Sequence, residues 1–291
     1  EGQYFELVQL ADWITKLEPR FTSVWAYHGW NLAYNISVLF EAPEDRWRWV
    51  RHGISLLRDE GLKYNPGEPR LLFELGWMFQ HKIAAPVDQA HAYYKQAWAA
   101  EMVDLFDGPR PDYGALTLAA PTRGELLRRP GVADLVRQLE AQGRDPFRPA
   151  RLIEARTSTL DPLLHTAAGQ QLVDHLRLRR LQDDYKLDPA LMREVDATYG
   201  PLDWRLPQAH AVYWAWQSRL VAHGFDALAA DRMIFQSLVD AFRQGSLFTG
   251  DRGDLFIPSP NPDLLPRVRQ AFLDAMRRHP DQPNIGDAYV N

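Results

Sequence analysis

Length, composition and charge set the first limits on this chain. Its 291 residues are enough for two units of ordinary domain size or for one extended solenoid. A net charge of -5 gives no global footprint for nucleic acid. The sequence has no cysteine, which excludes disulfides, thiolate catalysis and cysteine-ligated metals. No apolar run approaches the about 20 residues of a membrane-spanning helix.

Apolar residues recur at three- and four-residue steps through the first third of the chain, which predicts consecutive amphipathic helices. The predicted helices cover 3–18, 22–40, 46–63, 69–82 and 87–102. Prolines and turn residues separate them, at Pro19, Glu41–Asp45, Asn65–Gly67 and Pro86. Pro69 fits the first turn of its helix, because the N–H that proline lacks has no helical partner there.

The helices at 69–82 and 87–102 follow the pattern of a tetratricopeptide (TPR) repeat, a helix-turn-helix of about 34 residues. Small residues in this pattern let two helices approach, and large ones fill the groove between them. The matching residues are Leu72, Leu75, Gly76 and Phe79 in the first helix and Ala90, Tyr94 and Ala97 in the second. The preceding unit is less regular. Arg58 stands there where an aromatic residue is expected, so we expect Leu57 to pack in its place.

Residues 3–102 therefore resemble TPR proteins. The resemblance implies an all-α fold, a TPR-like α-solenoid of antiparallel helix pairs whose first helices line a concave peptide-binding groove. By that analogy the groove side chains are Trp30, Tyr34, Arg70, Phe73, Trp77 and Gln80. The phrases LADWITKLEP, AYHGWNLAYNIS, RWRWVRHGI and ELGWMFQHKI also resemble uncharacterised bacterial membrane-anchored proteins. That second resemblance implies an anchor upstream of Glu1 and a place on the periplasmic side of the bacterial cell envelope.

Beyond this region the helical period stops and then resumes. Turn residues dominate 106–131, which we interpret as a Pro/Gly-rich linker or loop between TPR-like repeats at 1–105 and a helical region at 132–291. Within that region the predicted helices cover 132–142, 161–186, 189–199, 206–222, 227–244 and 262–279. A loop is expected at 247–261 and an extended tail after Pro280. Whether these helices continue the solenoid stays open.

The common phosphate, dinucleotide, zinc-protease and hydrolase motifs do not occur, so the sequence predicts no cofactor, no metal and no catalytic constellation. His81, Asp88 and His91 have a spacing that can ligate a divalent ion. We favour a helix-end interpretation for them, because His81 and Lys82 lie in a last helical turn that favours positive charge.

Two further groups carry chemistry. Glu74 lies between Phe73 and Trp77, where burial can raise its pKa toward acid catalysis, although Arg70 one turn earlier favours an ordinary ion pair. The basic cluster of Arg177, Arg179 and Arg180 can contact phosphate or an acidic partner. A solvated face balanced by Asp183 and Asp184 is the interpretation that we prefer for it.

The preferred function is a non-catalytic scaffold that binds a peptide or helix of another protein in the groove. Nucleic acid is not an expected partner, and a membrane is expected only through an upstream anchor. Two alternatives stay open. One is an all-helical enzyme that acts on cell-wall glycan or peptide in a cleft between the halves, and the other is a structural subunit of an envelope assembly.

Overall fold

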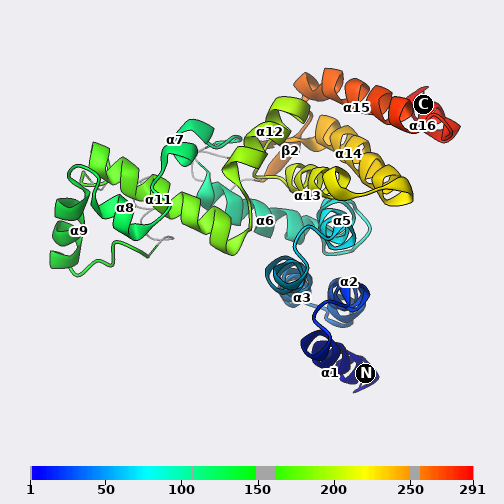
Figure 1. Ribbon diagram of the computed structural model, residues 1–291, viewed down its shortest axis with the longest axis horizontal. Coiled ribbons are helices and arrows are strands. Elements are labelled where there is room, and N and C mark those ends of the chain that lie inside the picture. Colours follow the sequence, from blue (N-terminus) through cyan, green and yellow to red (C-terminus); the bar gives the residue numbers. More distant parts are fainter. Residues whose placement is uncertain (1, 107, 149–161, 250–255, 291) are drawn as a thin grey trace. The chain divides into compact units, whose positions relative to one another are not determined.

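The computed structural model is mostly helical, which supports the all-α class (Figure 1). It describes residues 2–106, 108–148, 162–249 and 256–290. The chain forms two compact units. The larger unit comprises Glu1–Ala100 and Val195–Asn291, and the smaller unit comprises Glu101–Glu194. This division differs from the predicted one, because both ends of the chain build the same unit.

The N-terminal helices of the larger unit change type along their length. They are α1 (Gly2–Leu17), α2 (Thr22–Trp30), η1 (Asn31–Ile36), η2 (Ser37–Leu39), α3 (Pro43–Ser55), η3 (Leu56–Gly61), α4 (Leu62–Tyr64), α5 (Pro69–Trp77), η4 (Met78–Ala84) and α6 (His91–Leu105). The segments η1, η3 and η4 are π-helical, and η2 is a 3-10 helix. The helices predicted at 22–40, 46–63 and 69–82 are confirmed, but each runs from α-helical into π-helical geometry.

Helices α2 and α3 approach so closely that their backbones meet at glycine. A Cβ atom on Gly53 would lie 2.6 Å from the carbonyl oxygen of Gly29, which is closer than van der Waals contact allows. The side chain of Leu57 fills the space above Gly29, where an added Cβ would lie 2.6 Å from the Leu57 Cγ. Leu57 is fully buried. The expectation that Leu57 packs in the place of Arg58 is therefore confirmed.

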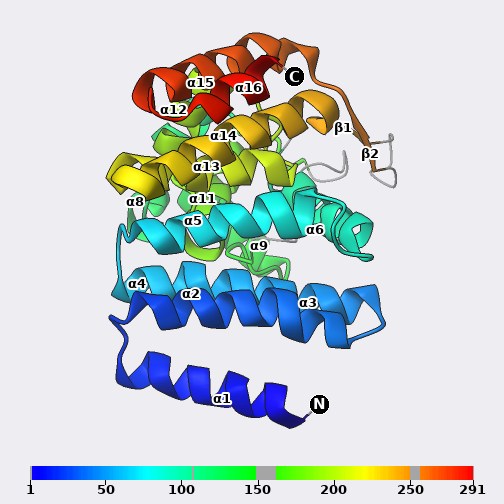
Figure 2. The same cartoon turned by 90° about the vertical axis from the view of Figure 1, so that its right-hand side faces the viewer.

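The stack of helices continues across a long gap in the sequence. Helix α5 packs against α13 (Pro207–Val221), which packs against α14 (Gly224–Gln244) and, through it, α15 (Leu265–Arg278). Figure 2 shows these helices of the larger unit as successive layers, with α5 between α2 and α13. A Cβ atom on Gly76 would lie 2.6 Å from the Met233 Sδ, so this glycine permits the approach to the C-terminal helices.

Buried charge also holds the C-terminal layers of the larger unit together. The carboxylate of Asp231 on α14 is buried and forms ion pairs with Arg219 on α13 at 3.2 Å and with Arg278 on α15 at 2.8 Å. His279 Nε2 lies 2.8 Å from the same carboxylate. One carboxylate therefore ties three helices.

The C-terminal part of the larger unit contains two structures that the sequence analysis did not predict. Strands β1 (Ser246–Phe248) and β2 (Ile257–Ser259) form an antiparallel pair within the expected loop at 247–261, with Leu247 opposite Pro258. Beyond the 3-10 turn η5 (Pro262–Leu264) and α15, helix α16 (Pro283–Val290) replaces the expected extended tail. Burial of Ile285 stabilises this last helix against its neighbours.

The smaller unit has its own apolar core. Its helices are α7 (Tyr113–Leu118), α8 (Arg123–Leu127), α9 (Val132–Ala141) and α11 (Ala167–Asp184). The core is formed by Ala120, Leu126, Val132, Leu135, Val136, Leu139, Leu164, Leu172 and Leu176. Two of these residues come from the predicted linker at 106–131. That segment is therefore part of a folded unit, and two short helices form in it because Asp112 and Thr122 cap their N-termini.

The chain leaves the larger unit within α6 and returns to it within α12 (Pro189–Tyr199). The predicted helix at 161–186 begins later than expected, at Ala167, where the Thr166 hydroxyl caps it by accepting a hydrogen bond from the Gly169 N–H. Asp161 lies outside the described residues. Among the helices that the structure describes, none combines the length and the apolarity needed to cross a membrane.

Candidate binding surface

Five rings from two helical segments of the larger unit form a continuous row, which we call the aromatic strip. It consists of Trp30, Tyr34, Phe73, Trp77 and His81. On α5 and η4 the rings stack one turn apart, with centroids 6.4 Å apart for Phe73 and Trp77 and 4.5 Å apart for Trp77 and His81. On α2 and η1 the centroids of Trp30 and Tyr34 are 5.4 Å apart. Each row is thus a stacked ladder along one helix face.

A contact between Tyr34 and His81 joins the two ladders. The Tyr34 hydroxyl lies 3.2 Å from His81 Nδ1, and the ring centroids are 5.8 Å apart. Burial lowers the pKa of His81, and the nearby Lys82 cation lowers it further. Burial also raises the pKa of Tyr34, and the carboxylate of Glu74 adds to this effect. A neutral imidazole can therefore accept the proton of a neutral phenol, which fixes the angle between the ladders.

The aromatic strip is accessible along part of its length. Trp30 is 37% exposed, and Tyr34, Phe73 and Trp77 are each half-buried. Aromatic rings that belong only to a hydrophobic core are covered on both faces. The rings of this strip are partly exposed, so a ligand can contact them. Arg70 is exposed on the same helix as Phe73 and Trp77.

Gln80 differs from the other residues expected in the groove. Its side chain is buried and donates a hydrogen bond through Nε2 to the Met233 carbonyl oxygen at 3.4 Å. His81 lies four residues after Trp77, the same step that separates Phe73 from Trp77, so it continues the row of rings on that helix face. Gln80 is turned toward α14 instead.

Glu74 is half-buried beside the aromatic strip. Burial raises the pKa of its carboxyl group, and the positive charge of Arg70 acts in the opposite direction. The ion pair that the sequence favoured is not formed: among the described residues no ion pair joins Arg70 to Glu74, and the charge of Arg70 has a smaller effect on Glu74 than burial has. Neither of the two depressions described below is lined by Glu74 or His81.

A buried ionic group lies directly beneath the strip. Lys82 Nζ is 5.0 Å from the centroid of the Tyr34 ring and 2.5 Å from Asp88 Oδ2. Arg46 contacts the same carboxylate at 3.3 Å, and the Ala90 N–H donates to Asp88 Oδ1 at 2.8 Å. Burial alone would raise the pKa of Asp88, but the hydrogen bond from Lys82 holds it below its ordinary value. Burial lowers the pKa of Lys82.

The possible metal ligands do not converge. Asp88 binds Lys82, Arg46 and a backbone N–H, while His81 contacts Tyr34. Among the described residues, no group of three or more histidine or acidic side chains can hold a metal ion. Asp88 instead caps the turn before α6, in agreement with the helix-end interpretation. The sequence did not predict that Arg46 binds Asp88. Its position near the start of a helix with apolar inward residues could have suggested a buried charge.

A depression of about 490 Å³ opens beside this ionic group. We call it the Arg46 pocket, and its lining residues are Val38, Phe40, Glu41, Arg46, Val87, Asp88 and Gln89. Val38 follows Tyr34 by one helical turn, and Asp88 is bonded to the lysine that underlies the Tyr34 ring. The Arg46 pocket therefore lies close to Tyr34, where the two ladders meet.

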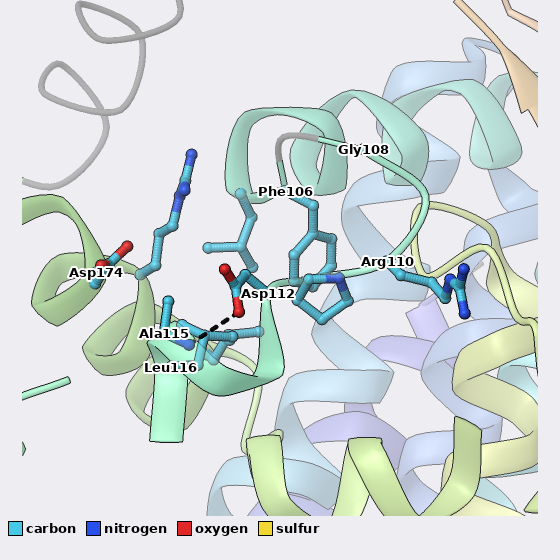
Figure 3. A pocket seen from close by; sticks show the side chains of 11 residues that line it. Phe106, Gly108, Arg110, Asp112, Ala115, Leu116 and Asp174 are labelled. Carbon is cyan, nitrogen blue, oxygen red and sulfur yellow. Dashed lines mark hydrogen bonds between the residues drawn. The ribbon is translucent and has the colours of Figure 1, made fainter. Parts of the chain in front are cut away.

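The smaller unit has a second, smaller depression of about 180 Å³ (Figure 3). Phe106 and Leu116 provide apolar walls, and Asp112 is held at the edge by a 2.9 Å hydrogen bond from the Ala115 N–H. Pockets for drug-sized ligands measure about 300–1,000 Å³, so this volume suits at most a single side chain or fragment.

The solvated face preferred from the sequence for the arginine cluster on α11 is present only at Arg179, because the Arg180 side chain is 15% exposed and Arg177 is buried. Arg179 forms an ion pair with Asp183 at 2.7 Å, and Arg180 approaches Asp184 at 3.9 Å. Arg177 is buried and lines the depression of the smaller unit. The three arginines therefore do not form one basic patch.

Comparisons with known proteins add no relative. No family model matches the chain, and neither a curated protein nor a solved structure matches it. The proposals that follow therefore rest on the geometry and chemistry of this chain.

Proposed function

We propose that this protein is a binding module whose larger unit is a TPR-like α-solenoid and whose aromatic strip holds a segment of another protein. The layered order of α1, α2, α5, α13, α14 and α15 supports the solenoid part of the proposal (Figure 2). In this arrangement α5 packs mainly against α13, not against α6 as the repeat pattern predicted, and the strip lies on α2 and α5 with their extensions η1 and η4.

The observation that carries the proposal is the partial exposure of a row of stacked rings. Large rings contribute more binding energy per residue than other side chains, and they dominate the centres of protein interfaces. The stacking also fixes their orientation before a partner arrives, which lowers the entropy cost of binding. The net charge of -5 favours a protein partner over nucleic acid. Following the family resemblance, we place that partner in the bacterial cell envelope, on the periplasmic side.

The test compares variants in quantitative affinity capture from the native cell. A Trp30→Ala, Trp77→Ala double variant removes two rings of the strip. Trp13→Ala is the matched control, because Trp13 is 55% exposed on α1 and lies outside the strip. We expect the wild type and the control to recover the same proteins, and the double variant to lose at least one of them while keeping its circular dichroism. Equal recovery by all three would refute the proposal.

Two alternatives each have one observation in their favour. Glu74, with a raised pKa in a half-buried position between Phe73 and Trp77 in the sequence, favours a catalytic function on cell-wall glycan or peptide. Exposed Leu10, Trp13 and Leu17 on α1 favour a structural subunit that buries this face in an envelope assembly. The capture experiment addresses both, because Trp13→Ala weakens an assembly contact through α1, and an enzyme need not retain a stable partner.

A further inference from the structure

We propose that the Arg46 pocket is a carboxylate subsite, which receives an acidic side chain of the segment bound on the aromatic strip. The inference rests on the proposed function and specifies the chemistry of the partner: an aspartate or glutamate placed next to the residues that contact the rings.

Continuity between the two features is the first argument. Lys82 touches both, since its Nζ lies 5.0 Å from the centroid of the Tyr34 ring and 2.5 Å from Asp88 Oδ2 in the pocket wall. Val38 follows Tyr34 by four residues, is 48% exposed and lines the pocket. A chain that lies along the strip past Tyr34 therefore reaches the opening beside Arg46.

The balance of buried charge is the second argument. Arg46, Lys82 and Asp88 all have nearly buried side chains, with exposed fractions of 11%, 3% and 3%. They place two positive charges around one negative charge. An uncompensated charge that is largely removed from water is costly, and a further anion relieves that cost.

Geometry shows which cation lacks a full partner. Lys82 binds the Asp88 carboxylate at 2.5 Å, whereas Arg46 Nη2 lies 3.3 Å from Oδ1 and 3.5 Å from Oδ2. The Ala90 N–H takes further acceptor capacity of the same carboxylate. Within the described residues, the buried Nε of Arg46 has no hydrogen-bond partner. The guanidinium group therefore keeps a positive charge that the Asp88 carboxylate, shared with Lys82, does not fully balance.

The other lining residues select the kind of anion. Val38, Phe40 and Val87 offer apolar contacts to an aliphatic stem. Glu41 also lines the opening, and together with Asp88 it would repel a dianion such as phosphate more strongly than a monoanion. A carboxylate on a short aliphatic stem fits both conditions, and these are the features of an aspartate or glutamate side chain.

The experiment uses the full chain and small probes, so it does not need the partner. N-acetylglutamate α-amide is titrated against isotope-labelled protein, and the Arg46 side-chain resonance and the backbone amides of residues 87–89 are followed by NMR. N-acetylglutamine α-amide is the matched neutral probe, and inorganic phosphate is the competing anion. We expect saturable shifts with the carboxylate probe, none with the amide, and weaker binding of phosphate. Equal shifts with both amino-acid probes, or tighter binding of phosphate, would overturn the proposal.

Two variants localise the response without removing a buried charge. Glu41→Gln removes a negative charge from the exposed rim, so the probe should bind about twofold more tightly. Arg46→Lys keeps the charge but loses the planar pair of donors, so binding should weaken. Arg48→Lys, at an exposed position on the same helix, is the control and should leave binding unchanged. Unchanged affinity in both test variants would also overturn the proposal.

The two proposals fail separately. If the tryptophan variants recover the same partners as the wild type while the probe still binds at Arg46, the proposed function fails and the anion site stands. If the probe does not bind but the tryptophan variants lose a partner, only the carboxylate subsite fails.

Discussion

Individual side chains in this protein show how burial changes the behaviour of ionisable groups. Glu74 and Asp231 are both carboxylates in the larger unit, but they have opposite surroundings. Glu74 has Arg70 as a countercharge, but burial has the larger effect on its pKa. Asp231 is more deeply buried, but it has three partners that can carry positive charge. The number of partners, and not depth alone, decides whether the charge is tolerated.

Glu74→Gln tests how burial of the Glu74 carboxyl group affects the stability of the fold. The raised pKa means that the folded protein holds the proton more tightly than the unfolded chain does, so wild-type stability should fall as pH rises from the ordinary value near 4.5 through the raised folded value. The glutamine variant lacks this loss. Thermal unfolding at pH 7 should therefore show a higher midpoint for the variant, and the difference should shrink toward pH 4. A lower midpoint for the variant at pH 7 would contradict the expectation.

The same variant separates two functions. A binding module should still recover its partner with glutamine at position 74, because the shape of the side chain is kept. An enzyme that uses Glu74 as a proton donor should lose at least about 100-fold in rate. Peptidoglycan turnover by the purified wild type, absent in the variant, would favour the catalytic alternative.

Asp231→Asn tests how much the ion pairs of the buried Asp231 carboxylate stabilise the fold. The substitution leaves Arg219 and Arg278 facing a neutral amide in a buried position, and breaking such a pair costs about 3–5 kcal/mol of stability. Urea denaturation measures the loss. Asp134→Asn is the matched control, because its ion pair with Arg137 is exposed and contributes at most about 1 kcal/mol. Similar losses of stability in the two variants would show that the ion pairs of Asp231 do not stabilise the fold.

At the level of the helices, close approach is controlled by glycine. Gly53→Val would place a Cβ atom 2.6 Å from the Gly29 carbonyl oxygen and add two methyl groups to a closed contact between α2 and α3. Overpacking of this kind costs about 1–3 kcal/mol, so the thermal unfolding midpoint should fall. Gly124→Val is a control, since no neighbouring atom lies within 4 Å of a Cβ at that position.

The helices themselves were predictable because their period is local. Leu72, Leu75 and Phe79 are all buried, as their spacing indicated. Two features were not predictable. The period identifies an apolar face but not the element that covers it, so the pairing of α5 with α13 was missed. The period also assumes α-helical geometry, so the π-helical segment that follows Trp77 gave no signal.

The candidate site was predictable to a similar degree. Four of the predicted groove residues lie in the strip, because an exposed aromatic on a regular helix keeps its face. The ionic group of Arg46, Lys82 and Asp88 was missed, since it joins α3, η4 and the following turn. Such contacts depend on tertiary packing and not on local spacing. The short hairpin and α16 also went unrecognised, because proline and glycine nearby were interpreted as irregular structure.

At the level of the molecule, the larger unit should form from two pieces of chain. Residues 1–100 alone leave α5 and η4 without α13, so Gly76 and Phe79 lose their cover. When expressed as separate chains, residues 1–100 and 195–291 should associate and gain helicity on mixing. Circular dichroism and size-exclusion chromatography measure both effects. Cooperative unfolding of a monomeric 1–100 fragment by itself would contradict this expectation.

The discontinuous larger unit has a consequence for synthesis on the ribosome. Helix α5 is complete after residue 77, but the helix that covers it begins at Pro207 and emerges only after the whole smaller unit has been made. At about 5–20 residues per second, the apolar face of α5 is uncovered for several seconds to about half a minute in each round of translation. The smaller unit has its own core and can fold during that interval. During that interval we expect chaperones to bind the nascent chain at the uncovered face of α5 around Gly76.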